Sequence, residues 1–283
     1  MSDEPSTTPA TTDRARSFGS VAEAYDRGRP TYPAEAIAWL AGGEAKVVLE
    51  LAAGTGKLTR GLVDQGHAVF ATEPDEAMLE VLRRRVPEVS AKVATAEEIP
   101  ANDRSVDVVV VAQAFHWFDH ESALPEIARV LKPGGHVALV WNSRDERIPW
   151  VRRMGGLLGR QDLDTSSSEQ LVHSDLFGFM EEASFKHWQE VNRETILDMA
   201  RSRSSFATMD EAERERHLRD VLAFYDDFGR GMDGMQIPYV TRCYRAVVVD
   251  RDEQTTSDGD GPSQEGPVVS DGTDTDMLLI DFR

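Results

Sequence analysis

One short stretch, Val47 to Thr59, restricts the fold of this chain more than any other part of it. Its apolar start, Val47 to Leu49, is typical of a buried parallel strand and leads into the small-residue turn Ala52-Ala53-Gly54-Thr55-Gly56. The residues from Lys57 to Gln65 then predict a helix. A strand, a tight turn and a helix in this order leave free backbone N–H groups at a point where a ligand can approach closely. The stretch therefore predicts a ligand site in an α/β sheet.

Three kinds of ligand use such a turn, and the spacing of its residues separates them. A phosphate-binding P-loop is excluded, because Leu51 stands where its first glycine belongs and Leu58 replaces its hydroxyl residue. A dinucleotide site lacks its third glycine at Thr59, and Glu50 would repel a pyrophosphate, although an NAD-dependent oxidoreductase stays open as the alternative. An S-adenosylmethionine site needs a carboxylate near its cationic end and small residues under the cofactor. Glu50 and the turn supply both features.

The composition agrees with an enzyme built on one core domain. The chain has 283 residues, 40% of them hydrophobic, so it can bury a sizeable core. Its net charge of -19 argues against nucleic acid as a partner, because phosphate binding needs a basic surface. No apolar run approaches a membrane span and the first residues are polar, so we expect a cytoplasmic protein without a membrane partner. The single cysteine, Cys243, excludes an internal disulfide, and we expect no metal because histidines and carboxylates do not cluster at ligand spacing.

Strand and helix patterns alternate through the first half of the chain. Further strands are predicted at residues 68–72, 90–94, 107–111 and 136–142, separated by helices at 76–86 and 122–131. A sixth strand is expected at 185–191 and a last one at 237–249. This order predicts an α/β fold with a doubly wound, mostly parallel, seven-stranded Rossmann-like sheet, whose ligands bind at the carboxyl ends of the strands.

The chain divides into six expected parts. Its acidic C-terminal segment is poor in apolar residues, apart from its end, Met277 to Phe282, which could pair with a sheet edge or a second copy. The sequence therefore leaves both a homodimer and a monomer as alternatives. The parts are a disordered N-terminus (1–16), a helical lid (17–45), the cofactor-binding α/β core (46–142), a helical substrate-covering insertion that contains the sixth strand and a loop at Ser166–Ser168 (143–236), the last strand (237–249) and an acidic flexible tail (250–283).

A second carboxylate follows the second predicted strand. Glu73 lies 23 positions after Glu50, close to the roughly 20-residue interval at which a carboxylate meets ribose hydroxyls in nucleotide-binding sheets. A charge at a helix start is the alternative interpretation, but Asp75 already fills that role. We therefore predict that Glu73 binds the ribose of a nucleoside cofactor.

Several motifs in the same order carry a resemblance to class I S-adenosylmethionine-dependent methyltransferases. The chain is most similar to the small-molecule branch, which includes trans-aconitate-methyltransferase-like and natural-product enzymes, and the resemblance covers about Ser17 to Val151. One departure is Ala52, which stands where the family usually has its first glycine. The motifs are Tyr25-Asp-x-x-Arg29-Pro30-x-Tyr32-Pro33, Glu50-Leu-Ala-Ala-Gly-Thr-Gly56, Glu73-Pro74, Thr95-Ala96-Glu97, Gln113-Ala-Phe-His-Trp-Phe118 and Leu131-Lys-Pro-Gly-Gly135.

The resemblance implies S-adenosylmethionine as cofactor, S-adenosylhomocysteine as product, a small-molecule acceptor and two sets of site residues. The cofactor set has Tyr25, Arg29 and Tyr32 closing over the cofactor carboxylate; it also contains Glu50, Ala52, Gly54, Thr55, Gly56, Leu58, Glu73, Pro74, Met78, Ala96, Glu97 and Gln113. The acceptor set is Phe115, His116, Trp117, Trp141, Asn142 and Trp150.

His116 is the best-placed candidate for a catalytic base, because it follows the fourth strand and imidazole titrates near neutrality. A wall residue between Phe115 and Trp117 is the other interpretation of His116. A cofactor-binding protein without catalysis is a further alternative for the whole chain, against which the aromatic run Phe115 to Phe118 and the insertion indicate a second ligand.

Overall fold

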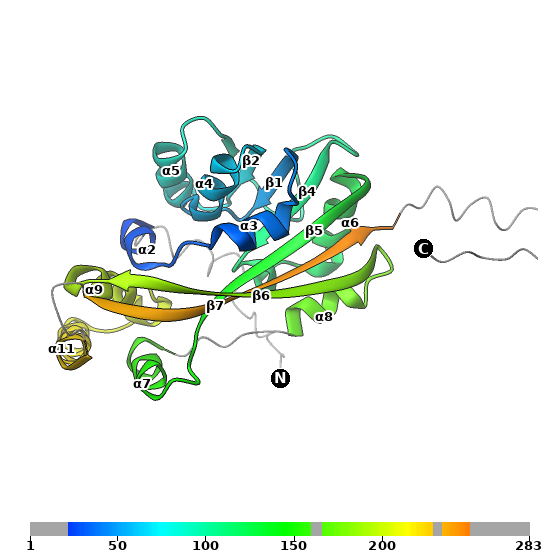
Figure 1. Ribbon diagram of the computed structural model, residues 1–283. Coiled ribbons are helices and arrows are strands. Elements are labelled where there is room, and N and C mark those ends of the chain that lie inside the picture. The colour runs from blue at the N-terminus through cyan, green and yellow to red at the C-terminus, as the bar shows by residue number, and fades with distance from the viewer. Residues whose placement is uncertain (1–21, 160–165, 229–233, 250–283) are drawn as a thin grey trace, which may run out of the picture. The chain divides into compact units, whose positions relative to one another are not determined.

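The computed structural model describes residues 22–159, 166–228 and 234–249, and its strands form one sheet in the order β3-β2-β1-β4-β5-β7-β6 (Figure 1). β7 is antiparallel to both of its neighbours, and the remaining neighbouring pairs are parallel. The prediction of a mostly parallel, seven-stranded α/β sheet is confirmed. The strands are β1 (Val47–Leu51), β2 (Ala68–Thr72), β3 (Ser90–Lys92), β4 (Val106–Ala112), β5 (Leu131–Arg144), β6 (Phe177–Val191) and β7 (Met235–Val248).

The helices connect and cover these strands. In the described ranges no helix has both the length and the apolar composition that a membrane crossing requires. The expected disordered N-terminus and acidic tail lie outside the described residues. The helices are α2 (Ala22–Gly28), α3 (Ala34–Ala41), α4 (Lys57–Asp64), α5 (Glu76–Arg85), the 3-10 turn η2 (Phe115–Trp117), α6 (His120–Val130), α7 (Pro149–Leu158), α8 (Ser166–Val172), α9 (Arg193–Arg201), α10 (Ser204–Ala207) and α11 (Glu211–Phe228).

The valines of β4 occupy the centre of the sheet and pack against helices on both faces. Val108 and Val110 pack with side chains of α3, α4 and α5, whereas Val109 and Val111 pack with side chains of α6 and α8. All four valines have no exposed surface, because successive side chains of a strand point to opposite faces and helices cover both. The continuous apolar runs of the sequence therefore correspond to strands buried on two sides.

A third apolar cluster holds the helices of the predicted insertion. Met154 of α7, Ile196 of α9 and Phe224 of α11 pack with Ile237 of β7. Figure 1 shows α9 and α11 gathered at one end of the long strands β6 and β7, with α7 nearby. Since the parallel strands end on the same side, these helices lie beyond the carboxyl edge of the sheet, where ligands bind in such folds.

Several predicted boundaries were wrong. β5 begins at Leu131 rather than His136, because Leu131 pairs with Val106 and the expected turn lies within the strand. β6 begins at Phe177 rather than Phe185, because its pairing with β7 extends along most of its length. β3 ends two residues early, at Lys92. The loop expected at residues 166–168 is instead the start of α8.

Candidate cofactor and acceptor site

Three positions of the glycine turn after β1 have left-handed backbone angles but different surroundings. Ala52 and Gly54 have φ angles of 52° and 57°, in the left-handed region, and Gly56 follows with 82°. A Cβ on Gly54 would meet nothing within 4 Å, so this part of the turn faces open space. A Cβ on Gly56 would lie 2.9 Å from Leu82 Cγ, so this glycine lets α4 and α5 approach each other. The left-handed φ of Ala52 carries strain that a glycine would not, at the position where the resemblance leads us to expect a glycine.

Two buried carboxylates lie beneath this turn. Glu73, which is 6% exposed, accepts the Gly54 amide through Oε2 at 2.8 Å and the Asp75 amide through Oε1 at 2.9 Å. Glu50, which is 1% exposed, accepts the Thr59 hydroxyl at 2.6 Å. Each Glu73 oxygen keeps a further lone pair for a ligand hydroxyl. Glu50 lies near the end of β1 and Glu73 directly follows β2, and the carboxyl ends of these two strands are neighbours because β1 and β2 pair in parallel.

The electrostatics of these two groups favour a cationic or hydroxyl-bearing ligand. Burial is the main cause that raises the pKa of Glu50 to about 8; the hydrogen bond from Thr59 opposes this rise and the nearby Glu73 adds to it. Burial also raises the pKa of Glu73 to about 7, against the two amide bonds. A neighbouring positive charge stabilises an ionised carboxylate. The cationic methionine end and the ribose of S-adenosylmethionine therefore fit these residues, whereas a pyrophosphate does not.

Residues 22–33 are part of the predicted lid (17–45), are called the lid segment below, and lie next to this turn. Tyr32 forms a hydrogen bond with the Gln113 side chain, and burial, followed by Tyr25 and Glu50, raises the pKa of its phenol. The Arg29 guanidinium lies 4.9 Å from the centre of the Tyr25 ring. The structure thus brings the three predicted lid residues together with Glu50 and Gln113. Gln113 itself has a φ of 61°, a strained value of the kind that concentrates at binding sites.

Asn142 fixes the lid segment to the end of β5. Its Nδ2 donates to the Thr31 carbonyl at 3.0 Å, and its Oδ1 accepts the Thr241 hydroxyl at 2.6 Å. Its backbone carbonyl accepts Gln113 Nε2 at 3.4 Å. Asn142 is 3% exposed, so these contacts favour a role in holding the lid segment rather than direct contact with an acceptor.

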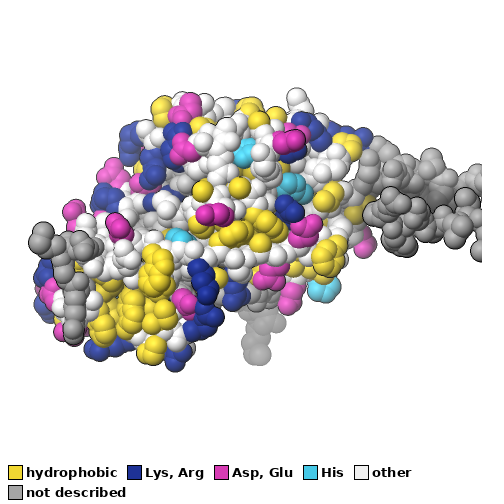
Figure 2. All heavy atoms as spheres, viewed as in Figure 1, with side chains coloured by type: hydrophobic (Ala, Val, Ile, Leu, Met, Phe, Trp, Pro, Cys, Tyr) yellow, Lys and Arg dark blue, Asp and Glu magenta, His cyan; other side chains and the backbone are white. Residues whose placement is uncertain are grey.

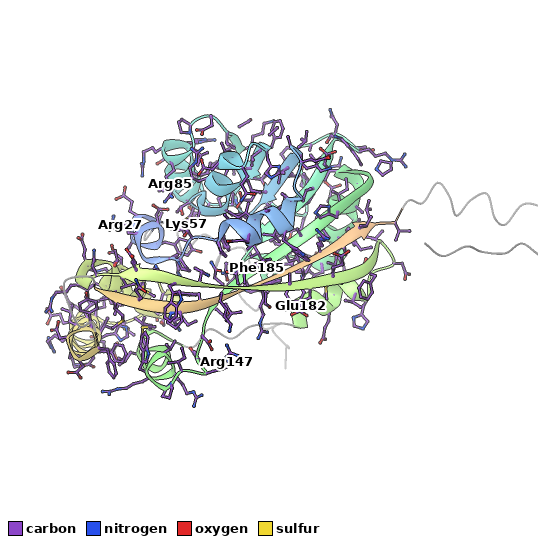
Figure 3. All side chains as sticks on the ribbon, viewed as in Figure 1. Arg27, Lys57, Arg85, Arg147, Glu182 and Phe185 are labelled. Atoms are coloured by element: carbon purple, nitrogen blue, oxygen red, sulfur yellow. The ribbon has the colours of Figure 1, made fainter. Side chains whose placement is uncertain are left out.

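Helix α2 bridges the sheet and the predicted insertion (Figure 3). Asp26 forms ion pairs with Arg85 of α5 and, at 4.0 Å, with Lys57 of α4. Arg27 Nε donates to Asp198 of α9 at 2.7 Å. The helices are in direct backbone contact, because a Cβ on Gly28 would lie 2.6 Å from the Met199 nitrogen. These contacts hold the lid segment across the carboxyl edge of the sheet.

The remaining predicted cofactor residues are distributed around the same edge. Thr55 is 1% exposed and Leu58 also 1%, both within the turn and the start of α4. Met78 of α5, which is 4% exposed, packs with Tyr25 and follows the half-buried Pro74. Ala96 is buried in the core, and Glu97 accepts the Asp119 amide at 3.0 Å. Their contacts with a cofactor stay predictions.

The predicted acceptor residues do not form one wall. Phe115 has no exposed surface and packs in the core with Trp141, whose ring contacts Tyr244. Trp150 stacks on Phe228 of α11. These placements favour packing roles for the three. His116 and Trp117 are half-buried on η2 with ring centres 4.6 Å apart, directly after Gln113 and Ala114.

Sequence reasoning missed a group of basic residues at the same edge. Arg144 ends β5, two residues beyond the predicted strand, and pairs in register with Tyr239 of β7. Arg203 follows α9. The pattern of β5 could have found Arg144, because a strand that continues for two residues places it on the face of Asn142. No local pattern indicated that Arg203 would lie within electrostatic range of Arg144 and Tyr239.

Comparison with known proteins agrees with this geometry. The methyltransferase domain family matches residues 49–139. An uncharacterized methyltransferase of Mycobacterium tuberculosis is 43% identical over 239 residues, which are 83% of this chain and 97% of the relative. An uncharacterized methyltransferase-like protein of Schizosaccharomyces pombe is 32% identical over 241 residues, which are 81% of this chain and 93% of the relative. A solved structure from Anaeromyxobacter dehalogenans, provisionally named a type II methyltransferase, has a TM-score of 0.53 and 26% identity and covers 77% of this chain and 97% of its own.

The sequence identity over nearly the full length of these relatives and the strand order of the sheet lead to one family. The chain belongs to the class I S-adenosylmethionine-dependent methyltransferases and is an enzyme.

Proposed function

We propose that this enzyme transfers the methyl group of S-adenosylmethionine to oxygen, nitrogen or carbon of a small-molecule acceptor in the cytoplasm. The observation that carries the proposal is the pair of buried carboxylates, Glu50 and Glu73, beneath the open side of Gly54, with the lid segment fixed beside them. On the face that Figure 2 draws, Lys and Arg side chains lie singly or in small groups among acidic ones, and the net charge of -19 is unfavourable for a nucleic-acid substrate. A nucleic-acid substrate would need a continuous basic surface.

The residues divide between the two ends of the cofactor. The Glu73 oxygens accept the ribose hydroxyls, and Glu50 balances the positive charge of the methionine end. Gly54 lets the cofactor lie against the backbone, since its missing side chain leaves open space there. The Arg29 guanidinium, held over Tyr25, pairs with the cofactor carboxylate. When bound, S-adenosylmethionine supplies an electrophilic methyl group on a sulfonium.

Positioning is the main contribution of the protein to this reaction. Alignment of two reacting groups can lower a barrier by roughly 7–11 kcal/mol, whereas a general base contributes about 10²–10⁴-fold. The lid segment excludes water from the reacting atoms because Tyr32, Gln113 and Asn142 hold it to the ends of β4 and β5. His116, which follows Gln113 by three residues, is the candidate base for an acceptor group that must lose a proton, but we expect its ring mainly to shape the site.

The alternative of an NAD-dependent oxidoreductase is disfavoured by the same carboxylates. A pyrophosphate beside Glu50 and Glu73 would add negative charge to a buried acidic site, at a cost in electrostatic free energy. Membership of the methyltransferase family likewise disfavours a binding protein without catalysis.

Titration calorimetry with S-adenosylhomocysteine, S-adenosylmethionine and NAD tests the proposal. We expect binding of the first two and not of NAD. Glu73→Ala should weaken S-adenosylhomocysteine binding by about 1–3 kcal/mol, because ribose hydroxyls lose their acceptor. The control Glu76→Ala, an exposed residue of the first turn of α5, should leave the affinity unchanged. Binding of NAD in place of S-adenosylhomocysteine would disprove the cofactor assignment.

A further inference from the structure

Strand β6 is the last strand at one side of the sheet and pairs, among the described strands, with β7 alone (Figure 1). It is 15 residues long, and its pairing with β7 is regular from Met180 to Val191, after an irregularity that follows Phe177. Alternate residues of this stretch direct their backbone N–H and C=O groups away from β7, toward a side where the described ranges contain no further strand. Natural edge strands are usually short or covered, because a long free edge readily pairs with another chain.

The two faces of β6 differ in exposure. On one face, Phe185 packs with the apolar cluster of α3, and Gln189 donates to the Gly28 carbonyl at 3.2 Å. On the other face, alternate side chains from Glu182, which Figure 3 labels together with Phe185, to Glu190 are exposed to solvent. This exposed face carries two acids, a serine, a lysine and a tryptophan at residues 182, 190, 184, 186 and 188.

Aromatic side chains on β6 are unusually accessible. Phe179 is 89% exposed and Trp188 60%, and these are the two highest values among the large hydrophobic residues that the structure describes. Both lie on the strand with the free edge. Exposed apolar side chains combined with unpaired backbone groups indicate a surface that binds another chain.

Two opposite charges on the exposed face are available to a partner strand. Glu182 has a hydrogen bond with Tyr244, and Lys186 lies within electrostatic range of Asp145, which itself pairs with Arg147. Neither Glu182 nor Lys186 forms an ion pair inside the described ranges. A partner strand that meets both charges must therefore carry a lysine and a glutamate at the same spacing in reverse order.

A second copy of β6 carries that sequence. A twofold axis pairs a strand antiparallel with itself, and opposite residues then point to the same face, so the axis passes through one residue. With the axis at Ser184, Glu182 lies opposite the partner's Lys186 and Lys186 opposite the partner's Glu182. Met180 lies opposite the partner's Trp188 in the same register. All of these residues belong to the regular part of β6.

The neighbouring registers do not match in this way. An axis at Glu182 or at Lys186 places like charges opposite each other. An axis at Ala183 places Met180 opposite the partner's Lys186, and an axis at Phe185 places Trp188 opposite the partner's Glu182. Opposite charges directly across two strands stabilise their pairing, whereas like charges destabilise it. The charges therefore select the axis at Ser184.

We propose that two copies of this protein associate through β6, with the twofold axis at Ser184, and form one continuous sheet. A lysine on an edge strand usually prevents self-association, but Lys186 meets a glutamate here. The proposal is separate from the proposed function, because β1, β2 and β4, which position the candidate cofactor site, are separated from β6 by β5 and β7.

Charge reversal in the full-length protein tests both the surface and the register. Sedimentation velocity at about 0.15 M salt, which screens the repulsion between two chains of net charge -19, should show a wild-type dimer at up to about 100 µM. Glu182→Lys and Lys186→Glu each place like charges opposite each other and should raise the dissociation constant at least about tenfold. The two substitutions combined in one chain restore both pairs in exchanged order, so the constant should return to within about threefold of wild type.

Glu190→Lys is the matched control. It changes the charge by the same amount on the same exposed face, but residue 190 lies opposite the partner's Gly178, so the dissociation constant should stay within about threefold of wild type. The melting temperatures of all variants confirm that the fold is retained. In addition, Ser184→Cys should form a disulfide between two copies on oxidation, because the axis places the two thiols opposite each other, whereas the buried Cys243 of the wild type should not.

Three outcomes would overturn the proposal. A wild-type protein that is monomeric at about 100 µM refutes it, and protection of the β6 amides from hydrogen exchange in that monomer would give the edge to another occupant. A dimer that persists in both single charge variants would use a different surface. Loss of the dimer in the single variants without recovery in the combined variant would exclude the axis at Ser184.

Discussion

The two glycines of the turn after β1 allow the cofactor assignment to be separated from the stability of the fold. Gly54→Ala places a methyl group in open space, so its cost is the strain of a left-handed φ of 57°, about 1–2 kcal/mol, less about 0.4–1 kcal/mol from a stiffer unfolded chain. Gly56→Ala carries the same strain and also drives a methyl group to 2.9 Å from Leu82, which has no exposed surface. Overpacking adds about 1–3 kcal/mol there.

Gly56→Ala should therefore mainly lower the stability of the fold, whereas Gly54→Ala should mainly weaken cofactor binding. Gly56→Ala should lower the melting temperature by roughly 5–15 °C, and Gly54→Ala by at most about 5 °C. Gly54→Ala should weaken S-adenosylhomocysteine binding by about tenfold or more, because the methyl group occupies the space in which we place the cofactor. Differential scanning calorimetry and titration calorimetry on both variants provide the measurements. A Gly54→Ala protein that binds S-adenosylhomocysteine as tightly as the wild type would refute the placement of the cofactor on this turn.

Three further predictions follow from other parts of the site. Burial raises the pKa of Glu50 from 4.5 to about 8 in the folded protein, so its contribution to stability is present below pH 4.5 and is lost as the pH rises toward 8. Glu50→Gln should therefore reduce the decrease in melting temperature between pH 4.5 and 8, measured without ligand. A pH dependence of the melting temperature equal to that of the wild type would contradict this prediction. Gly28→Ala forces a methyl group against the backbone of Met199 and should increase hydrogen exchange in α2, whereas Gly43→Ala, with no atom near its Cβ, should not; equal exchange in both would exclude close packing of α2 on α9. We expect the His116 ring only to shape the site, so His116→Phe should retain most of the activity and the same dependence of kcat on pH. Near-complete loss of activity in both His116→Phe and His116→Ala, with cofactor binding intact, would instead make His116 the catalytic base.

The parts of the fold that sequence could predict are those that local patterns encode. The valines of β4 and the glycine turn after β1 carry their structure in their own order, because a strand buried on both faces must be apolar and a sharp turn must be small. β6 was predicted at less than half of its length, since this edge strand alternates half-buried and exposed residues and depends on pairing with β7. Its polar residues give no apolar run from which the full strand could be predicted.

The residues of the candidate site also differ in how far local sequence patterns predict them. Glu50 and Glu73 could be proposed because Glu50 lies near the end of the first strand, Glu73 directly follows the second, and the 23 positions between them are close to the spacing in nucleotide-binding sheets. The bond between Tyr32 and Gln113 was not, because it joins residues 81 positions apart whose contact depends on the completed fold. Arg203 lies on an insertion whose length and path no periodic pattern specifies. The sequence could predict the residue types at strand ends, but not which residues from distant parts of the chain come into contact.

The position of β7 has a consequence for the synthesis of the protein. β7 is the last described strand in the chain, yet it lies between β5 and β6 in the sheet. Until residue 248 has emerged from the ribosome, the nascent chain carries an unpaired edge on each of the strands that β7 will join. Unpaired edges readily pair with other chains. A ribosome that stalls between residues 191 and 235 should therefore release an aggregation-prone product, and its proteolytic removal is the outcome to follow in cells.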